Sequence, residues 1–332
     1  MKYLSRWVFL IAAFTSWSLY AQEALIENPK FKEFVGALND FSRSTEQLSL
    51  TEARVLSTKF FLPPETVYEP VEQILNLQII GLDGNMLPLR IFIPDTSKAL
   101  PVIIYFHRGG FVFGNNDEAD PVCRKIANHL QCIVVSVEYR LAPEHPFPKP
   151  LEDCYLATQW IAEHICHYGG DAKNLIVCGE SAGGNLAAAV ALMARDKQGP
   201  QLSAQLLIYP VITASIQDDV YDNSQDQYFL TKDRMKFFWS MYLPPKHEKN
   251  PYASLDCGTD FSGLPPALII TAQHDALRHE AEQYAEKLID AGVPVVQCCF
   301  LGAIHGFLDL PIYDEYRKVS WIEDIGRILN KS

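Results

Sequence analysis

Seven apolar runs alternate with helical stretches through most of the chain, and this alternation limits the fold more than any other feature. The run VIIYF at 102–106 is apolar at every position, which indicates a strand buried on both faces. Alternating segments of this kind predict an α/β fold with a mostly parallel sheet flanked by helices. The expected strands are 87–93, 101–107, 132–138, 174–179, 204–209, 267–272 and 295–301, and the expected helices are 120–130, 151–168, 184–197, 280–291 and 313–329.

A serine lies in a short motif at the junction of one expected strand and one expected helix. The run GESAG at 179–183 follows the apolar run at 174–178 and precedes an alanine-rich stretch. Glycines on both sides of the serine remove Cβ atoms from a tight turn, so its hydroxyl is expected to stand clear of the sheet and to face solvent. Ser181 is therefore the candidate nucleophile, and Glu180 beside it supports the motif.

A serine nucleophile needs a general base and an acid that orients the base. Among nine histidines, His305 stands out because it follows the last expected strand, at the same sheet edge as Ser181. Asp275 closely follows the strand at 267–272, and the order Ser181, Asp275, His305 predicts a catalytic triad. Two plainer interpretations stay open, namely that His305 is a surface-loop residue and that Asp275 only caps a helix.

A glycine pair follows another expected strand, in the run YFHRGGF at 105–111. Acyl transfer builds negative charge on a carbonyl oxygen, and this charge needs N–H donors that are already in place. The N–H groups of Gly109, Gly110 and Ala182 are the expected donors. A glycine pair is also typical of an ordinary turn, so its meaning depends on the motifs around it.

These motifs together resemble those of the bacterial hormone-sensitive-lipase family of carboxylesterases, the family IV esterases. The resemblance extends over about residues 70–325, and its five motifs occur in the family's order. HRGGF at 107–111 resembles HGGGF, YRLAPEHPFP at 139–148 resembles the same string in the family, GESAGGN at 179–185 resembles GDSAGGN, DALR at 275–278 resembles DPLR, and GAIHGF at 302–307 resembles GMxHGF.

The resemblance implies an α/β-hydrolase fold with a helical cap and a serine carboxylesterase that acts on small-molecule esters of short or medium acyl chain. It implies no cofactor and no metal. It also gives His107 and the segment 139–148 a mainly architectural role. Two alternatives stay open: an amide or lactone hydrolase that uses the same triad, and a catalytically silent ligand-binding protein of the same fold.

Three residues depart from the family's motifs. Glu180 replaces an aspartate, which we interpret as tolerated variation. Arg108 replaces a glycine, and its Cβ would be strained if the backbone needed a positive φ. We expect activity to survive, and we expect the long cation to narrow or charge the pocket mouth and to favour substrates that carry an acid group. His279 stands where the family commonly has an acidic residue, and the sequence suggests no role for it.

Two regions interrupt the alternation of strands and helices. We expect residues 22–75 to form N-terminal cap helices, and residues 76–332 to form the catalytic domain with a cap insertion near 212–262. The alternative for the N-terminal part is a set of packing helices without a substrate role. Four aromatic residues of the insertion line the acyl pocket or form the core of the cap: Phe237, Phe238, Trp239 and Tyr242.

The ends and the overall charge bear on location and partners. Residues 1–21 carry Lys2 and Arg6, then an apolar run and a small or polar stretch, which is typical of a signal peptide. We therefore expect export to the periplasm or the medium, with an uncleaved membrane anchor as the alternative. A formal net charge of -12 argues against nucleic acid as a partner. A transient membrane contact through the cap and a homodimer stay open.

Eight cysteines accompany this export signal. Most fall inside expected strands or helices and show no small-scaffold spacing, so we interpret them as small core residues. A disulfide between Cys123 and Cys132, or between Cys154 and Cys166, stays open if the compartment is oxidising.

Overall fold

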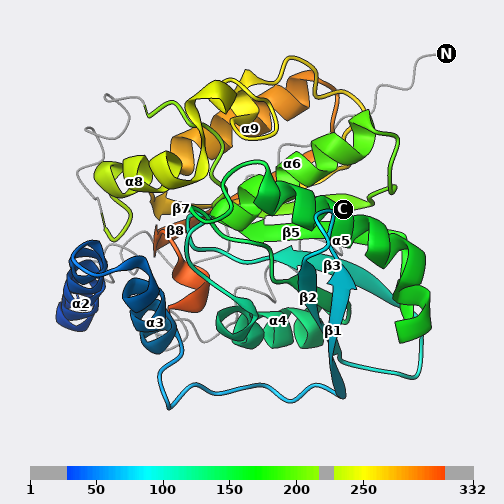
Figure 1. The fold of residues 1–332 in the computed structure, drawn as a ribbon, viewed down its shortest axis with the longest axis horizontal. Helices are drawn as coiled ribbons and strands as arrows, with labels where there is room; N and C mark the ends of the chain where they lie inside the picture. The colour runs from blue at the N-terminus through cyan, green and yellow to red at the C-terminus, as the bar shows by residue number, and fades with distance from the viewer. Residues whose placement is uncertain (1–27, 217–227, 311–332) are drawn as a thin grey trace.

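An eight-stranded sheet forms the centre of the part of the chain that the computed structural model describes, residues 28–216 and 228–310 (Figure 1). The strand order is β1-β2-β4-β3-β5-β6-β7-β8. The pairs β1·β2 and β2·β4 are antiparallel, and all other pairs are parallel. The strands are β1 Gln73–Ile80, β2 Met86–Ile93, β3 Leu100–Phe106, β4 Ile133–Val137, β5 Gly170–Glu180, β6 Ala204–Ile208, β7 Ala267–His274 and β8 Val295–Ile304.

All seven expected strands are present, so the prediction of an α/β fold with a mostly parallel sheet is confirmed. β1 is an addition to them. It lies at the edge of the sheet, pairs with β2 alone, and is mostly exposed or half-buried. An edge strand of this kind does not need a continuous apolar run, and so the apolar pattern does not reveal it.

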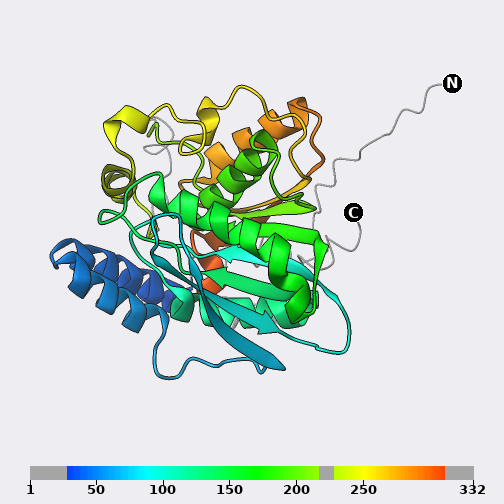
Figure 2. The same ribbon diagram turned by 45° about the vertical axis from the view of Figure 1, so that its right-hand side comes forward.

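Helices cover both faces of the sheet (Figure 2). α5, α6 and α9 pack on one face, and α4 packs on the other. β3 serves both faces, because Val102 and Ile104 belong to the first core and Ile103 and Tyr105 to the second. Four of the expected helices are thereby confirmed: α4 Asn116–Leu130, α5 Lys149–His164 with the 3-10 turn Ile165–Tyr168, α6 Ala182–Asp196 and α9 Arg278–Asp290.

Three further helices lie beyond the carboxyl ends of the strands, at the left of Figure 1. They come from distant parts of the chain: α2 Pro29–Glu46, α3 Leu50–Phe61 and α8 Lys232–Tyr242. In α2 the buried residues Phe31, Val35 and Leu38 recur at helical spacing. Arg234 of α8 donates a hydrogen bond to Ser42 Oγ of α2, so the N-terminal helices and the insertion are in contact. We refer to these two segments together as the cap.

Two expectations concern residues outside the described ranges, namely the export signal at 1–21 and the last helix at 313–329. Among the helices of 28–216 and 228–310, none combines the length and the apolar character that crossing a bilayer requires. All eight cysteines lie in these ranges as free thiols, so neither disulfide that the sequence left open is formed. Five of them are buried: Cys123, Cys132, Cys154, Cys178 and Cys298.

Candidate active site

Ser181 lies between the last residue of β5 and the first residue of α6. Its φ of 55° and ψ of -116° form a conformation that residues with a side chain rarely adopt. The neighbouring glycines allow close packing: a Cβ atom on Gly179 would lie 2.1 Å from the carbonyl oxygen of Gly183, and one on Gly183 would lie 2.0 Å from that of Phe106. The serine itself takes the strained conformation, and the glycines make room for it.

Three side chains from separate motifs meet in one hydrogen-bonded chain. His305 Nε2 lies 3.0 Å from Ser181 Oγ, and His305 Nδ1 lies 2.8 Å from Asp275 Oδ2. They follow the carboxyl ends of β5, β7 and β8, which run parallel and therefore end at the same sheet edge. A carboxylate that accepts a hydrogen bond from Nδ1–H keeps the proton of the neutral imidazole on Nδ1. Nε2 is then free to accept the proton of the serine hydroxyl.

The two plainer interpretations of these residues do not fit the structure. His305 is only 5% exposed, so it is not a surface-loop histidine. The cap residue of α9 is Leu277, and no side chain caps this helix. Asp275 Oδ1 instead accepts the N–H of Leu277 at 2.9 Å, a bond that orients the carboxylate while Oδ2 faces the imidazole.

Gly109 and Gly110 follow β3 with φ values of 121° and 61°. Ala182 is the first residue of α6, so its N–H lies at the positive end of that helix. Within the described residues, the N–H groups of Gly109, Gly110 and Ala182 donate to no protein acceptor. The start of α6 packs on the loop after β3, since Gly183 lies against the carbonyl group of Phe106. Unoccupied donors in this position suit a developing oxyanion.

His107 has a supporting place behind these glycines. Its buried ring stacks on Tyr139 with 4.1 Å between the ring centroids, and its Nδ1 donates to the Arg108 carbonyl oxygen at 2.8 Å. The Tyr139 hydroxyl donates to the His107 carbonyl oxygen at 2.7 Å. Burial lowers the pKa of His107 to about 4, so this imidazole stays neutral. These bonds fix the loop and leave His107 unsuited to proton transfer at neutral pH.

Glu180, next to the serine, is fully buried and accepts hydrogen bonds from the hydroxyls of Tyr105 and Tyr209. Burial and the nearby charge of Asp309 raise the pKa of Glu180 to about 8. The Tyr209 ring also packs edge-on against His305, with 4.9 Å between the ring centroids. The glutamate is thus held by tyrosines on both sides and does not enter the chain formed by Ser181 and His305.

Arg108 is not strained, because the positive φ values of this loop fall on Gly109, Gly110 and Phe111. Its guanidinium forms an ion pair with Asp309, and its Nη1 lies 3.9 Å from Glu118 Oε2. The expectation that Arg108 supplies a cation for acid-bearing substrates does not fit this arrangement, since the charge is already paired with carboxylates of the protein.

Two phenylalanine rings of the cap insertion lie against the site. A Cβ atom on Gly110 would lie 2.4 Å from the Phe238 ring, and one on Gly306 would lie 4.0 Å from the Phe229 ring. These contacts bring the cap onto the loop 107–111 after β3, which we call the oxyanion loop for its expected role, and onto the residue after His305. The prediction that Ser181 faces solvent is wrong, because this residue is only 7% exposed.

The other aromatic residues of α8 divide between the site and the core. Trp239 and Tyr242 pack on Phe111, and the Tyr242 ring stacks on it with 3.8 Å between centroids. Phe237 packs on Phe238. Of the four aromatic residues expected in the pocket or the cap core, Phe238 therefore lies against Gly110 of the oxyanion loop. Trp239 and Tyr242 pack as core residues on Phe111, the last residue of the same loop.

Three residues of the site were not singled out from sequence. Tyr209 bonds to Glu180 and packs on His305, and Asp309 pairs with Arg108. The sequence marks them only by position, since Tyr209 directly follows β6 and Asp309 lies in the loop of His305. Glu280 of α9 accepts the N–H of Ile212 at 2.7 Å, and burial raises its pKa to about 8. A glutamate on a helix gives no sign in sequence that its carboxyl group is buried.

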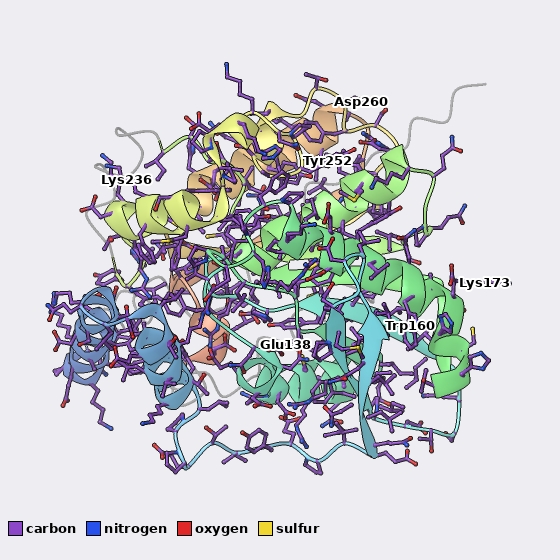
Figure 3. All side chains as sticks on the ribbon, viewed as in Figure 1. Glu138, Trp160, Lys173, Lys236, Tyr252 and Asp260 are labelled. Atoms are coloured by element: carbon purple, nitrogen blue, oxygen red, sulfur yellow. The ribbon has the colours of Figure 1, made fainter. Side chains whose placement is uncertain are left out.

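Other candidate features lie away from the triad. A polar cavity of about 380 Å³ beside β1, β2 and α4 is bordered by Arg90 and Glu138, and Figure 3 labels Glu138 next to α4. His279 is exposed on α9 and accepts a hydrogen bond from Gln283. Within the described residues, no group of three or more His, Cys, Asp or Glu side chains is arranged to hold a metal ion.

Comparison with known proteins gives a consistent result. The sequence pattern of the α/β hydrolase fold family matches residues 103–309. Carboxylesterase NlhH of Mycobacterium tuberculosis is 37% identical over 276 residues, which cover 81% of this chain and 85% of that protein. An arylesterase of Saccharolobus solfataricus is 33% identical over 73% of this chain and 79% of its own length. The solved structure of a hyperthermophilic esterase from Pyrobaculum calidifontis is 37% identical, with a TM-score of 0.78 over 88% of this chain and 96% of that one.

Proposed function

This chain belongs to the α/β hydrolase fold family as a carboxylic ester hydrolase of the hormone-sensitive-lipase-like group, and we propose that it cleaves short- to medium-chain esters through an acyl-enzyme on Ser181. The observation that carries the proposal is the chain of two hydrogen bonds, 2.8 Å from Asp275 to His305 and 3.0 Å from His305 to Ser181. A buried chain of this kind makes a neutral hydroxyl nucleophilic at neutral pH.

In the acylation half, Ser181 Oγ attacks the ester carbonyl carbon while His305 Nε2 takes its proton. Asp275 holds the imidazole in the required tautomer and stabilises the imidazolium. The N–H groups of Gly109, Gly110 and Ala182 stabilise the oxyanion of the tetrahedral intermediate.

The intermediate collapses when His305 returns the proton to the leaving alkoxide, so that the alcohol departs and the acyl group remains on the serine. A water molecule then attacks the acyl carbonyl carbon as His305 removes its proton. Collapse of the second intermediate releases the carboxylic acid and restores the serine hydroxyl.

The preference for short and medium acyl chains rests on the position of Phe238. Its ring lies so close to Gly110 that a single added methyl carbon would come within 2.4 Å of it. A large rigid ring next to the proposed oxyanion donors limits the space for the acyl chain, and each excluded methylene group costs about 1 kcal/mol of binding.

The test is hydrolysis of p-nitrophenyl esters from acetate to palmitate by the full chain and by its Ser181→Ala variant. We expect turnover to be highest for short or medium chains and to fall by about 10⁴-fold or more in the variant. Turnover that survives in Ser181→Ala would overturn the serine mechanism. No turnover of any ester by the folded protein would favour a silent binding protein, and turnover of amides or lactones alone would favour that hydrolase class.

A further inference from the structure

Arg108 occupies a position between two loops that the sheet keeps apart. It belongs to the loop after β3, directly before the proposed oxyanion residue Gly109. Its ion-pair partner Asp309 belongs to the loop after β8, four residues beyond His305. β3 and β8 are separated in the sheet by β5, β6 and β7. The pair therefore joins directly two loops that share no strand contact.

The cap helix α3 holds this arginine from the other side. The Arg108 guanidinium carbon lies 3.8 Å from the centroid of the Phe61 ring, a cation–π contact. Two more residues of the same helix face contact the surrounding backbone and side chains. Arg54 Nε donates to the Val112 carbonyl oxygen at 2.9 Å, and Thr58 Oγ1 donates to Glu118 at 2.7 Å.

These residues of α3 stand at positions 54, 58 and 61, the spacing that puts side chains on one face of a helix. The face is turned to the oxyanion loop and to the start of α4. The Arg108 guanidinium thus has packing contact with this helix face at the same time as its ion pair with Asp309.

Arg108 lies next to two carboxylates that are largely shielded from water. Its side chain is 14% exposed, and the side chains of Asp309 and Glu118 are 13% and 4% exposed. Glu118 Oε2 is buried without a hydrogen-bond partner among the described residues, and it faces Arg108 at 3.9 Å. One guanidinium therefore serves two carboxylates shielded from water. Removing one partner of such a group leaves an uncompensated buried charge.

We propose that Arg108 is a positioning residue, which ties the oxyanion loop to the loop of His305 through its ion pair with Asp309. Oxyanion donors act only when they lie within a few tenths of an ångström of the developing charge. A bond between the two loops keeps the donors of Gly109 and Gly110 in register with the base. This inference rests on the proposed serine mechanism. It adds an ion pair that a glycine, the residue of the family's motif at this position, could not form.

The test compares kcat and KM for p-nitrophenyl butyrate among full-length variants. Arg108→Met and Asp309→Asn should each lower kcat by about 10- to 100-fold while KM changes by less than about threefold, because displaced donors weaken transition-state binding only. The kcat of the double variant should be about that of the less active single variant, since both changes remove the same ion pair. Arg108→Lys should restore part of kcat, because it keeps the charge without the fork and the ring contact.

The matched control is Arg124→Met. Arg124 has a side chain of similar exposure, 18%, pairs with Asp120 and lies over the Tyr68 ring, but it joins α4 to the segment before β1 and touches neither the oxyanion loop nor the triad. This control should lower Tm and leave kcat unchanged. The proposal is overturned if Arg108→Met or Asp309→Asn lowers Tm as the control does but keeps the wild-type kcat, or if the losses in the double variant multiply.

If Arg108→Met does not fold, Arg108→Lys and the isosteric Asp309→Asn decide the question in the same way. The proposed function and this inference fail differently. An inactive wild-type chain, or an active Ser181→Ala, contradicts the serine esterase. An active wild type with unchanged kcat in the Arg108 and Asp309 variants contradicts the positioning role alone.

Discussion

The loops at the carboxyl ends of the strands meet the cap beside Gly110 and beside the residue after His305, but the two regions are built differently. The loops hold polar groups in fixed geometry, such as the bonds of 2.8 and 3.0 Å around His305. The cap offers aromatic rings, with Phe238 against Gly110 and Phe229 near Gly306. Hydrogen bonds fix atoms in direction and distance, whereas ring packing fixes only volume. We therefore expect changes in the loops to affect all esters alike and changes in the cap to depend on ester size.

The largest effect in the loops after that of Ser181 is expected from Asp275→Asn. An amide at this position can donate to Nδ1 of His305 and thereby favour the wrong tautomer. We expect kcat to fall by about 10³- to 10⁴-fold, by the same factor for acetate and for octanoate esters. Steady-state kinetics with both esters, together with an unchanged Tm, checks this. A loss that differs between the two esters would break the separation between loops and cap.

A smaller and selective effect is expected from Phe238→Ala. Removing the ring opens space beside the oxyanion loop, so the ratio of kcat/KM for decanoate over butyrate esters should rise by about tenfold. The matched control is Phe261→Ala. Both phenylalanines are 6% exposed, but Phe261 packs on Tyr284, away from the triad.

Both phenylalanine variants should lose about 3–5 kcal/mol of stability as the buried ring is removed. Only Phe238→Ala should change the acyl-length profile. An unchanged profile in Phe238→Ala, or an equal change in Phe261→Ala, would show that the cap does not set the chain length.

The last prediction concerns stability and not turnover. Glu280 joins the two regions, because it lies on the helix after Asp275 and accepts the N–H of Ile212, where the chain leaves β6 for the cap. Burial raises the pKa of Glu280 from 4.5 to about 8. The folded chain thus keeps a proton that the unfolded chain has lost, so this group's contribution to stability is full below about pH 4.5 and declines as pH rises to about 8.

Relative to Glu280→Gln, the wild type should therefore lose up to about 1 kcal/mol of unfolding free energy per pH unit over this interval. Calorimetric unfolding of both proteins between pH 5 and pH 8 measures the difference. Parallel stability curves for the two proteins would contradict this prediction, because they would mean that the Glu280 carboxyl group is ionised from pH 5 to pH 8 in the folded chain as well.

Much of the fold and of the polar site follows from local sequence. The strands that are buried on both faces have continuous apolar runs, and parallel strands must end at one edge, so the sequence predicts that Ser181, Asp275 and His305 lie close together. β1 escaped this reasoning because an edge strand needs no such run. Sequence also shows only part of the role of the glycines around Ser181. Gly179 lies against the Gly183 carbonyl group and Gly183 against that of Phe106, and the second contact depends on how α6 packs on β3.

Local sequence is enough to predict the layered α/β fold, the strand-to-helix turn at Ser181 and the strand-end positions of Asp275 and His305, because hydrophobic period and short motifs act over a few residues. Three contacts follow only from the tertiary packing: Arg108 pairs with Asp309, Phe238 lies against Gly110, and Glu280 is buried against Ile212. These contacts join residues 68 to 201 positions apart, and they depend on which side chains the packed cap and sheet exclude from water.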